Sequence, residues 1–172
     1  MIAACLVAVC CAVVGAVFLA LGQGSLTQSG AVCSILIGMI GGAWCGVATF
    51  RRTPRKDWKL VEGLLAIVFA LFALRAFCWL VYPSDEAIKV LSPNNLGDMS
   101  LHLTYIRYLA NGARFWPANP IFSDTPLHYP IGMDLFNALL TLLQVDLFRG
   151  LIWVGLIGCG FCAITLHRWG GS

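Results

Sequence analysis

The chain has 172 residues, of which 59% are hydrophobic and only 11% are charged. Globular domains carry about 25% charged residues, so this composition excludes an ordinary soluble domain and predicts an all-α, polytopic transmembrane protein. The net charge of +3 gives no reason to expect a nucleic-acid partner, because five of the eleven basic residues lie in one run, 51–59, between apolar segments.

Two apolar runs, 2–22 and 31–50, open the chain, and each has the length of about 20 residues that a helix needs to cross a bilayer core. The second run repeats glycine at helical spacing, which is typical of helices that pack closely in lipid. These glycines are Gly38, Gly41, Gly42 and Gly46. The basic run 51–59 indicates a cytoplasmic loop by the positive-inside rule. We therefore expect residues 1–59 to form a two-helix membrane extension with a cytoplasmic N-terminus.

A third apolar run, 60–82, carries Arg75 within its last two turns. Arg75 either extends to the membrane interface, as long basic side chains do, or faces a cavity and pairs with an acidic group or a phosphate. With 51–59 in the cytoplasm, the third run exits outward and the loop 83–130 is extracytoplasmic. These features predict an integral protein of a bacterial inner (plasma) membrane, with membrane lipid as a partner.

All eight cysteines lie in the apolar runs. Buried cysteine behaves as a small hydrophobic residue, so this placement does not predict a disulfide framework. Cys159 and Cys162 match the C-x-x-C spacing, but with no second pair and a position inside a helix they indicate packing rather than a redox or metal site.

A surface helix is predicted after a loop at 83–97, beginning at Asp98 and ending at Asn111-Gly112. One stripe of this helix is apolar and consists of Met99, Leu103, Ile106 and Ala110. The neighbouring stripe holds Asp98, His102 and Tyr105. Such a helix is expected to lie along the membrane surface with its apolar stripe toward the lipid and its polar groups toward a cavity.

Residues 113–130 contain four prolines and several aromatic residues, which predicts a rigid, extended segment at the interface. An apolar run at 131–147, interrupted by Asp134, precedes a last span at 151–166. The run 131–147 is short for a full crossing. It either dips into the membrane, which places the C-terminus in the cytoplasm, or crosses it, which places the C-terminus outside.

This order of elements resembles the GT-C superfamily, polytopic glycosyltransferases that use polyprenyl-phosphate sugars. The first matching block is Gly97-Asp98-(x)3-His102-(x)2-Tyr105-(x)6-Gly112. The second is Pro126-Leu127-His128-Tyr129-Pro130, leading into Leu135-Phe136-Asn137-Ala138-Leu139-Leu140. It is similar to the Lys-Pro-Pro-x-x-Tyr-like segment of aminoarabinose and mannosyl transferases, but has His128 where a lysine is often found.

The resemblance covers about residues 60–168 and implies that 60–172 is the N-terminal part of a GT-C core, because full members have many more spans. It implies transfer of a sugar from a lipid-linked donor, polyprenyl phosphate, on the extracytoplasmic face. No cofactor is implied. Asp98 and His102 lie one turn apart and can supply two ligands to a divalent metal, but two ligands alone do not make a metal site.

The implied chemistry needs a carboxylate that accepts the proton of the acceptor hydroxyl, and Asp98 is the candidate. An aspartate before a helix is equally a favoured N-cap, and the two roles can coexist. The pair Asp85-Glu86 and Asp124 are rival carboxylates. The expected substrate-binding residues are His102, Tyr105, Arg107, Arg114, His128 and Tyr129. The alternative for Tyr105 is an interfacial anchor, and for Arg107 and Arg114 it is plain contact with lipid headgroups.

Two other functional classes remain open at this point. A non-catalytic membrane subunit or scaffold would keep the same loop architecture without the reaction. A transporter fragment with charged groups in its spans would show paired broken helices in an inverted repeat, and the sequence has no such repeat.

Overall fold

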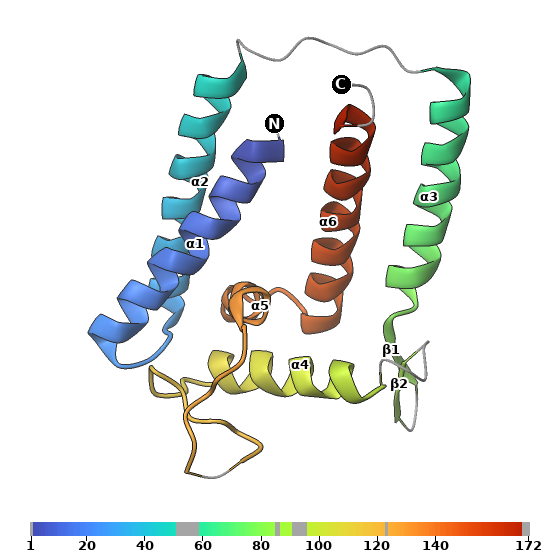
Figure 1. Ribbon diagram of the computed structural model, residues 1–172. Helices are drawn as coiled ribbons and strands as arrows, with labels where there is room; N and C mark the ends of the chain where they lie inside the picture. Colours follow the sequence, from blue (N-terminus) through green and yellow to red (C-terminus); the bar gives the residue numbers. More distant parts are fainter. Residues whose placement is uncertain (1, 51–58, 85–86, 91–95, 123, 170–172) are drawn as a thin grey trace.

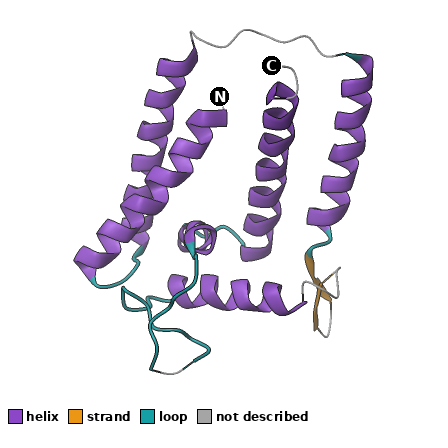
Figure 2. Cartoon of the chain, viewed as in Figure 1, coloured by secondary structure: helices purple, strands orange, loops and turns teal. Residues whose placement is uncertain are grey.

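The computed structural model describes residues 2–50, 59–84, 87–90, 96–122 and 124–169. Its elements, shown in Figures 1 and 2, are α1 (Ile2–Gln23), α2 (Gln28–Phe50), α3 (Leu60–Cys78), β1 (Val81–Ser84), β2 (Ala87–Val90), α4 (Leu96–Ala110), α5 (Gly132–Leu142) and α6 (Leu147–Trp169). In the described ranges, α1, α2, α3 and α6 are long and apolar enough to cross a membrane. The all-α, polytopic class predicted from composition is confirmed, and the chain is a membrane-embedded protein.

The four long helices stand side by side as two pairs, α1 with α2 and α3 with α6. Helix α4 lies across one end of both pairs, and α5 runs nearly perpendicular to the long helices just inside it (Figure 1). The start of α1 and the end of α6 both lie toward the opposite end of the long helices (Figure 1). The basic run expected to be a cytoplasmic loop lies outside the described residues except for Lys59.

Helices α1 and α2 meet along two facing rows of small residues spaced by four. The row on α1 is Ala4, Ala8, Ala12, Ala16 and Ala20, and the facing glycines on α2 are Gly38, Gly42 and Gly46. A β-carbon added at Gly38 would lie 2.5 Å from the carbonyl oxygen of Ala8, and one added at Gly42 would lie 2.8 Å from Ala8 Cβ. The backbones therefore approach closely, and the packing role predicted for these glycines is confirmed.

Helix α3 ends at Cys78, four residues before the end of the predicted span at 82. The loop expected at 83–97 begins instead as an antiparallel hairpin, in which Val81 pairs with Val90 and Pro83 with Ile88. Extended pairing suits the β-branched and aromatic residues at these positions. Because the backbone groups just beyond α3 pair across the hairpin, the helix does not continue. The prediction of an irregular loop at 83–97 was wrong for 83–84 and 87–90, which form strands, and for 96–97, which begin α4.

Helices α3 and α6 touch at both ends. Near the end occupied by α4, the ring of Phe77 covers Gly155 so closely that a β-carbon there has no room. At the other end, His167 Nδ1 lies 3.7 Å from the carboxylate of Glu62. Between these contacts most residues of α3 are exposed or partly exposed, and Ala73 is the one buried residue of this helix.

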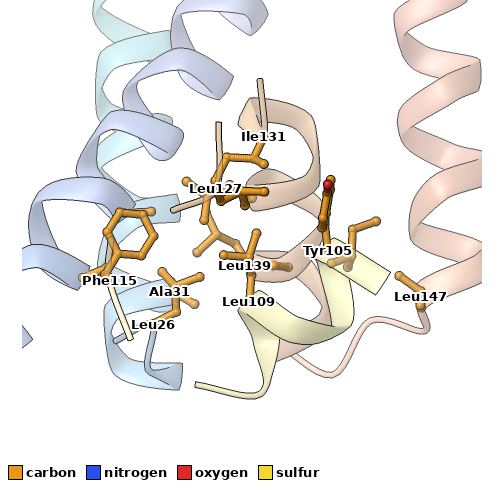
Figure 3. Packing of buried hydrophobic residues seen from close by; sticks show 14 residues of the cluster. Leu26, Ala31, Tyr105, Leu109, Phe115, Leu127, Ile131, Leu139 and Leu147 are labelled. Carbon is orange, nitrogen blue, oxygen red and sulfur yellow. The ribbon is translucent and has the colours of Figure 1, made fainter. Parts of the chain in front are cut away.

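Helix α4 packs its apolar side on α5, and loop residues close the cluster (Figure 3). Tyr105, Ile106 and Leu109 from α4 are almost completely buried. The other buried residues of the cluster come from α5, the segment before it, α1, the start of α2 and the start of α6: Ala16, Ala20, Leu26, Ala31, Phe115, Leu127, Ile131, Leu135, Ala138, Leu139 and Leu147. The expected lipid-facing stripe of α4 thus faces protein over much of its length.

The 11 residues of α5 rise about 16 Å, roughly half the thickness of a bilayer core. The run 131–147 therefore contains no helix long enough to cross a bilayer core. It ends in a turn around Gln144, and α6 begins at Leu147 rather than at 151.

The segment 113–130 folds back on itself and is not extended as predicted. The backbone N–H of Asn119 donates to the Thr125 carbonyl at 2.8 Å, and that of Leu127 donates to the Pro117 carbonyl at 3.0 Å. The indole N–H of Trp116 donates to Leu127 O at 3.1 Å. The proline-rich segment is therefore a folded loop and not an extended strand. Phe115 N–H joins this loop to the α1–α2 turn by donating to Gly24 O at 2.8 Å.

Candidate functional site

A histidine and an aspartate from different helices meet where α4 crosses α5. His102 Nδ1 lies 2.9 Å from Asp134 Oδ1, within hydrogen-bonding distance. His102 is on the middle of α4, and Asp134 is in the first turn of α5. The imidazole is about one-third exposed at 36%, whereas the aspartate side chain is 6% exposed. The pair therefore has a buried end at the carboxylate and an accessible end at the imidazole.

Burial governs the electrostatics of Asp134. Burial raises the pKa of this carboxyl above its ordinary value of 3.8, and the charge and hydrogen bond of His102 offset only part of that effect. The second carboxylate oxygen, Oδ2, is buried and has no hydrogen-bonding partner among the described residues. A buried oxygen without a partner is costly while the carboxyl is charged, so burial opposes the charged form of Asp134.

Two tyrosines line the same site. The Tyr129 ring centroid lies 5.9 Å from that of His102, edge to face, and 5.4 Å from that of Tyr105. Tyr105 is buried, and its burial, followed by Tyr129 and Asp134, raises the pKa of its phenol above 10.0. Tyr105 therefore stays neutral and keeps its hydroxyl proton. Tyr129, beside His102, is 37% exposed.

Of the seven predicted site residues, the structure brings His102, Tyr105 and Tyr129 together around Asp134. The other four are all exposed, and none of them forms a hydrogen bond or salt bridge with the pair: Asp98, Arg107, Arg114 and His128. Asp98 lies one turn before His102 on α4, which places the two Cβ atoms about 5–6 Å apart. Arg114 lies in the loop, where its backbone pairs with Ser25.

The prediction that Asp98 precedes the helix and caps its N-terminus was wrong. Helix α4 begins at Leu96, so Asp98 lies inside the first turn and does not precede the helix. A carboxylate there still interacts favourably with the helix dipole, but it is exposed and accessible to other partners. Of the rival carboxylates, Asp124 is exposed in the loop with a φ of 61°, and Asp85 and Glu86 lie outside the described residues.

Arg75 was predicted either to reach the interface or to face a cavity. Its guanidinium is exposed and lies 5.5 Å from the centre of the Trp79 ring, just beyond the end of α3. Within the described ranges no acidic side chain forms a salt bridge with it. This arrangement favours the interfacial reading, because tryptophan and arginine are both suited to that depth.

The sequence reading missed the roles of Asp134 and Asn137, both of which are buried on α5. Asn137 donates to the Met133 carbonyl at 2.9 Å, and its Oδ1 is buried without a partner among the described residues. A signal was present, because Asp134 lies three residues after Ile131 and four before Ala138, on the apolar face of a helix. A carboxyl on such a face needs a partner, and the polar stripe of α4 supplies one.

Metal binding finds little support in this geometry. Within the described residues, no three His, Cys, Asp or Glu side chains come together in a way that could hold a metal ion. The C-x-x-C cysteines on α6 are free thiols, one exposed and one partly exposed.

Comparison with known protein families, curated proteins and solved structures gives no match.

Proposed function

We propose that the chain belongs to a membrane glycosyltransferase of the GT-C kind and transfers a sugar from polyprenyl phosphate to an acceptor hydroxyl. The observation that carries this proposal is the exposed carboxylate of Asp98, one helical turn from the partly exposed His102, on a helix that lies across the ends of the long helices. Residues 60–172 form the catalytic unit in this proposal, and 1–59 form an anchoring extension.

In the proposed step, Asp98 accepts the proton of the acceptor hydroxyl as its oxygen bonds to the anomeric carbon. The bond between that carbon and the phosphate oxygen breaks, and its electron pair stays on the released polyprenyl phosphate. General-base assistance of this kind contributes about 10²–10⁴-fold to the rate. The exposure of Asp98 supports this role, because a base must reach the substrate.

The position of α4 suits a lipid-linked donor. A helix across the ends of membrane spans lies near the depth of the lipid headgroups, where the phosphate of such a donor is found. Exposed aromatic residues accompany it in the adjoining loop, among them Trp116 and Phe122. We place this end of the molecule outside the cytoplasm in a bacterial plasma membrane, and both termini inside.

The test is a transfer assay on the full-length protein reconstituted in lipid vesicles. Radiolabelled polyprenyl-phosphate sugars are supplied as donors, together with a membrane extract that contains acceptors. The proposal expects label to move from the donor to a product that requires the protein. Folded protein that releases label from none of the donors, with acceptors present, would contradict it.

A second candidate, a membrane subunit that works within a larger assembly, is favoured by one observation. Helix α3 has a single buried residue, Ala73, among 19, so much of its surface is available to lipid or to other helices. Purification of the protein in mild detergent distinguishes the two, because a subunit is recovered with stoichiometric partner chains and shows no transfer alone.

A further inference from the structure

We propose that the free edge of β2 binds an extended peptide segment of a partner protein. The segment adds to the β1–β2 hairpin as a third strand and places an acidic residue opposite Lys89. The hairpin takes no part in the sugar-transfer reaction described above. This inference therefore does not rest on the proposed function.

The hairpin has little support from the rest of the fold. It stands beyond the end of α3 (Figures 1 and 2), and among the described elements no helix packs along either strand. Each strand has four residues. An isolated two-stranded hairpin is marginally stable in water, and a third strand or a packed helix is what stabilises such a unit. A strand added at one edge would supply this support.

The pairing of Pro83 with Ile88 determines which backbone groups point outward. In an antiparallel pair of strands, residue pairs that exchange two hydrogen bonds alternate with pairs that exchange none. Proline has no N–H, so Pro83 and Ile88 form a pair without hydrogen bonds. The N–H and C=O of Ile88 therefore point away from β1, and those of Val90, two residues later, do the same.

The two edges of the hairpin differ in what they offer a partner. On the outer edge of β1, Pro83 leaves a gap in the row of donors, which is one way in which natural sheets protect an edge. On the outer edge of β2, Ile88 and Val90 each offer an N–H and a C=O. In the described part of the chain, no backbone hydrogen bond from another segment reaches these groups. An added strand pairs with residues at this spacing, so β2 is the edge that can accept one.

The apolar side chains of the hairpin favour the same edge. Side chains alternate between the two faces along a strand, so Ile88 and Val90 lie on one face, together with Val81, which pairs with Val90. Val81 is 3% exposed, whereas Ile88 is 56% exposed. An apolar side chain opposite Ile88 on an added strand would cover this residue and extend the apolar face.

Charge indicates the kind of partner. Lys89 is exposed, and it is the one charged residue among the described residues of the hairpin. In an added antiparallel strand, Lys89 would lie in a pair without hydrogen bonds, where opposed side chains are closest. An acidic residue opposite it is favourable, and a like charge is unfavourable. A second copy that used both outward residues of β2 would place the two Lys89 side chains opposite each other, so charge favours a different, acidic partner.

The test uses the full-length protein in lipid nanodiscs, which leave both membrane faces accessible. The probe is the peptide acetyl-Thr-Val-Glu-Val-Thr-amide at millimolar concentration, and a second peptide has lysine in place of glutamate. Amide hydrogen exchange at Ile88 and Val90 is the readout, because both N–H groups would be bonded only in the complex. We expect the glutamate peptide to slow exchange at both amides about tenfold or more at saturation. The lysine peptide should bind at least about threefold more weakly.

Three variants make the assignment specific. Lys89→Glu leaves the backbone unchanged and should reverse the preference, so that the lysine peptide binds more tightly. Lys89→Arg keeps the charge and is the matched control, with the preference of the wild type. Ile88→Pro removes an N–H that the hairpin does not use, as Pro83 does on β1, and should abolish the protection of Val90 by the glutamate peptide.

The contrary outcomes are distinct. Unchanged exchange with the glutamate peptide, or equal binding of the two peptides, would overturn the inference. Slow exchange at Ile88 and Val90 without any peptide would overturn it as well. If that slow exchange depended on the ratio of protein to lipid, a second copy would cover the edge. If it did not, the rest of the chain would cover it.

Discussion

His102 Nδ1 on α4 lies 2.9 Å from Asp134 Oδ1, 32 residues further along the chain on α5. This contact joins the helix that crosses the ends of the spans to the short helix that packs beneath it. It also places the one buried acid of the described residues directly behind an accessible imidazole. The packing of α5 against α4 therefore holds Asp134 against the exposed imidazole of His102.

Stability should depend on pH through Asp134. Burial raises the pKa of this carboxyl in the folded protein above 3.8, so the folded state favours the protonated form. A group with a raised folded pKa stabilises the protein at low pH, and this contribution is lost as pH rises through the raised value. Asp134→Asn, a neutral mimic, should match the wild type at low pH and become comparatively more stable as pH rises.

Thermal unfolding in detergent over a pH series measures this difference. The wild type and Asp134→Asn differ only at this site, so subtraction isolates the Asp134–His102 pair. A wild type that gains stability relative to Asp134→Asn as pH rises would show that the charged carboxylate is favoured in the fold, contrary to the argument.

The α1–α2 contact should not tolerate side chains at its glycines. Gly38→Ala places a methyl group 2.5 Å from the Ala8 carbonyl oxygen, so the helices must separate. Overpacking of this kind costs about 1–3 kcal/mol. Gly158→Ala on α6 is the matched control, because a β-carbon there meets nothing within 4 Å. Equal unfolding temperatures for the two alanine variants would mean that the helix pair is looser than described.

The predicted orientation is tested by labelling single cysteines in a background without the native eight. Thr125 is exposed in the loop between α4 and α5. Lys59 is exposed at the start of α3, which is the end of this helix away from α4. An impermeant thiol reagent on intact cells should label Thr125→Cys and leave Lys59→Cys unlabelled until lysis. Labelling of Lys59→Cys alone would reverse the proposed orientation.

The spans were predictable from sequence because each depends on a local quantity, the length of an apolar run. The small-residue repeat on α2 was predictable for the same reason, since Gly38, Gly42 and Gly46 recur at a fixed interval. The ends of the spans were harder to predict. Helix α3 stops at Cys78, because the residues that follow pair as a strand with residues up to nine positions later in the chain. Such pairing leaves no periodic mark in a short segment.

The site was only partly predictable. The sequence placed His102 and Tyr105 on one stripe of α4, and both contribute to the site. Asp134 was seen only as an interruption of an apolar run, because its partner lies on another helix and a contact of that range has no spacing rule. Recognition that a charged group on the buried face of α5 needs a partner would have narrowed the search to the polar stripe of α4.

The central claim is that α4 carries the proton acceptor of a sugar-transfer reaction, and Asp98→Asn tests it most directly. This change keeps the size of the side chain and removes the carboxylate, at a cost of about 0.3–1 kcal/mol from the helix dipole. Asp124→Asn is the matched control, since Asp124 is an exposed loop residue whose φ of 61° asparagine tolerates.

The measurement is the rate of sugar transfer from polyprenyl phosphate by reconstituted full-length protein, with the unfolding temperature of each variant beside it. The account predicts a rate lower by about 10²-fold or more for Asp98→Asn, with an unfolding temperature close to that of the wild type. It predicts wild-type transfer for Asp124→Asn. Wild-type transfer by Asp98→Asn would contradict the account and move the search for the base to Asp85, Glu86 or Asp124.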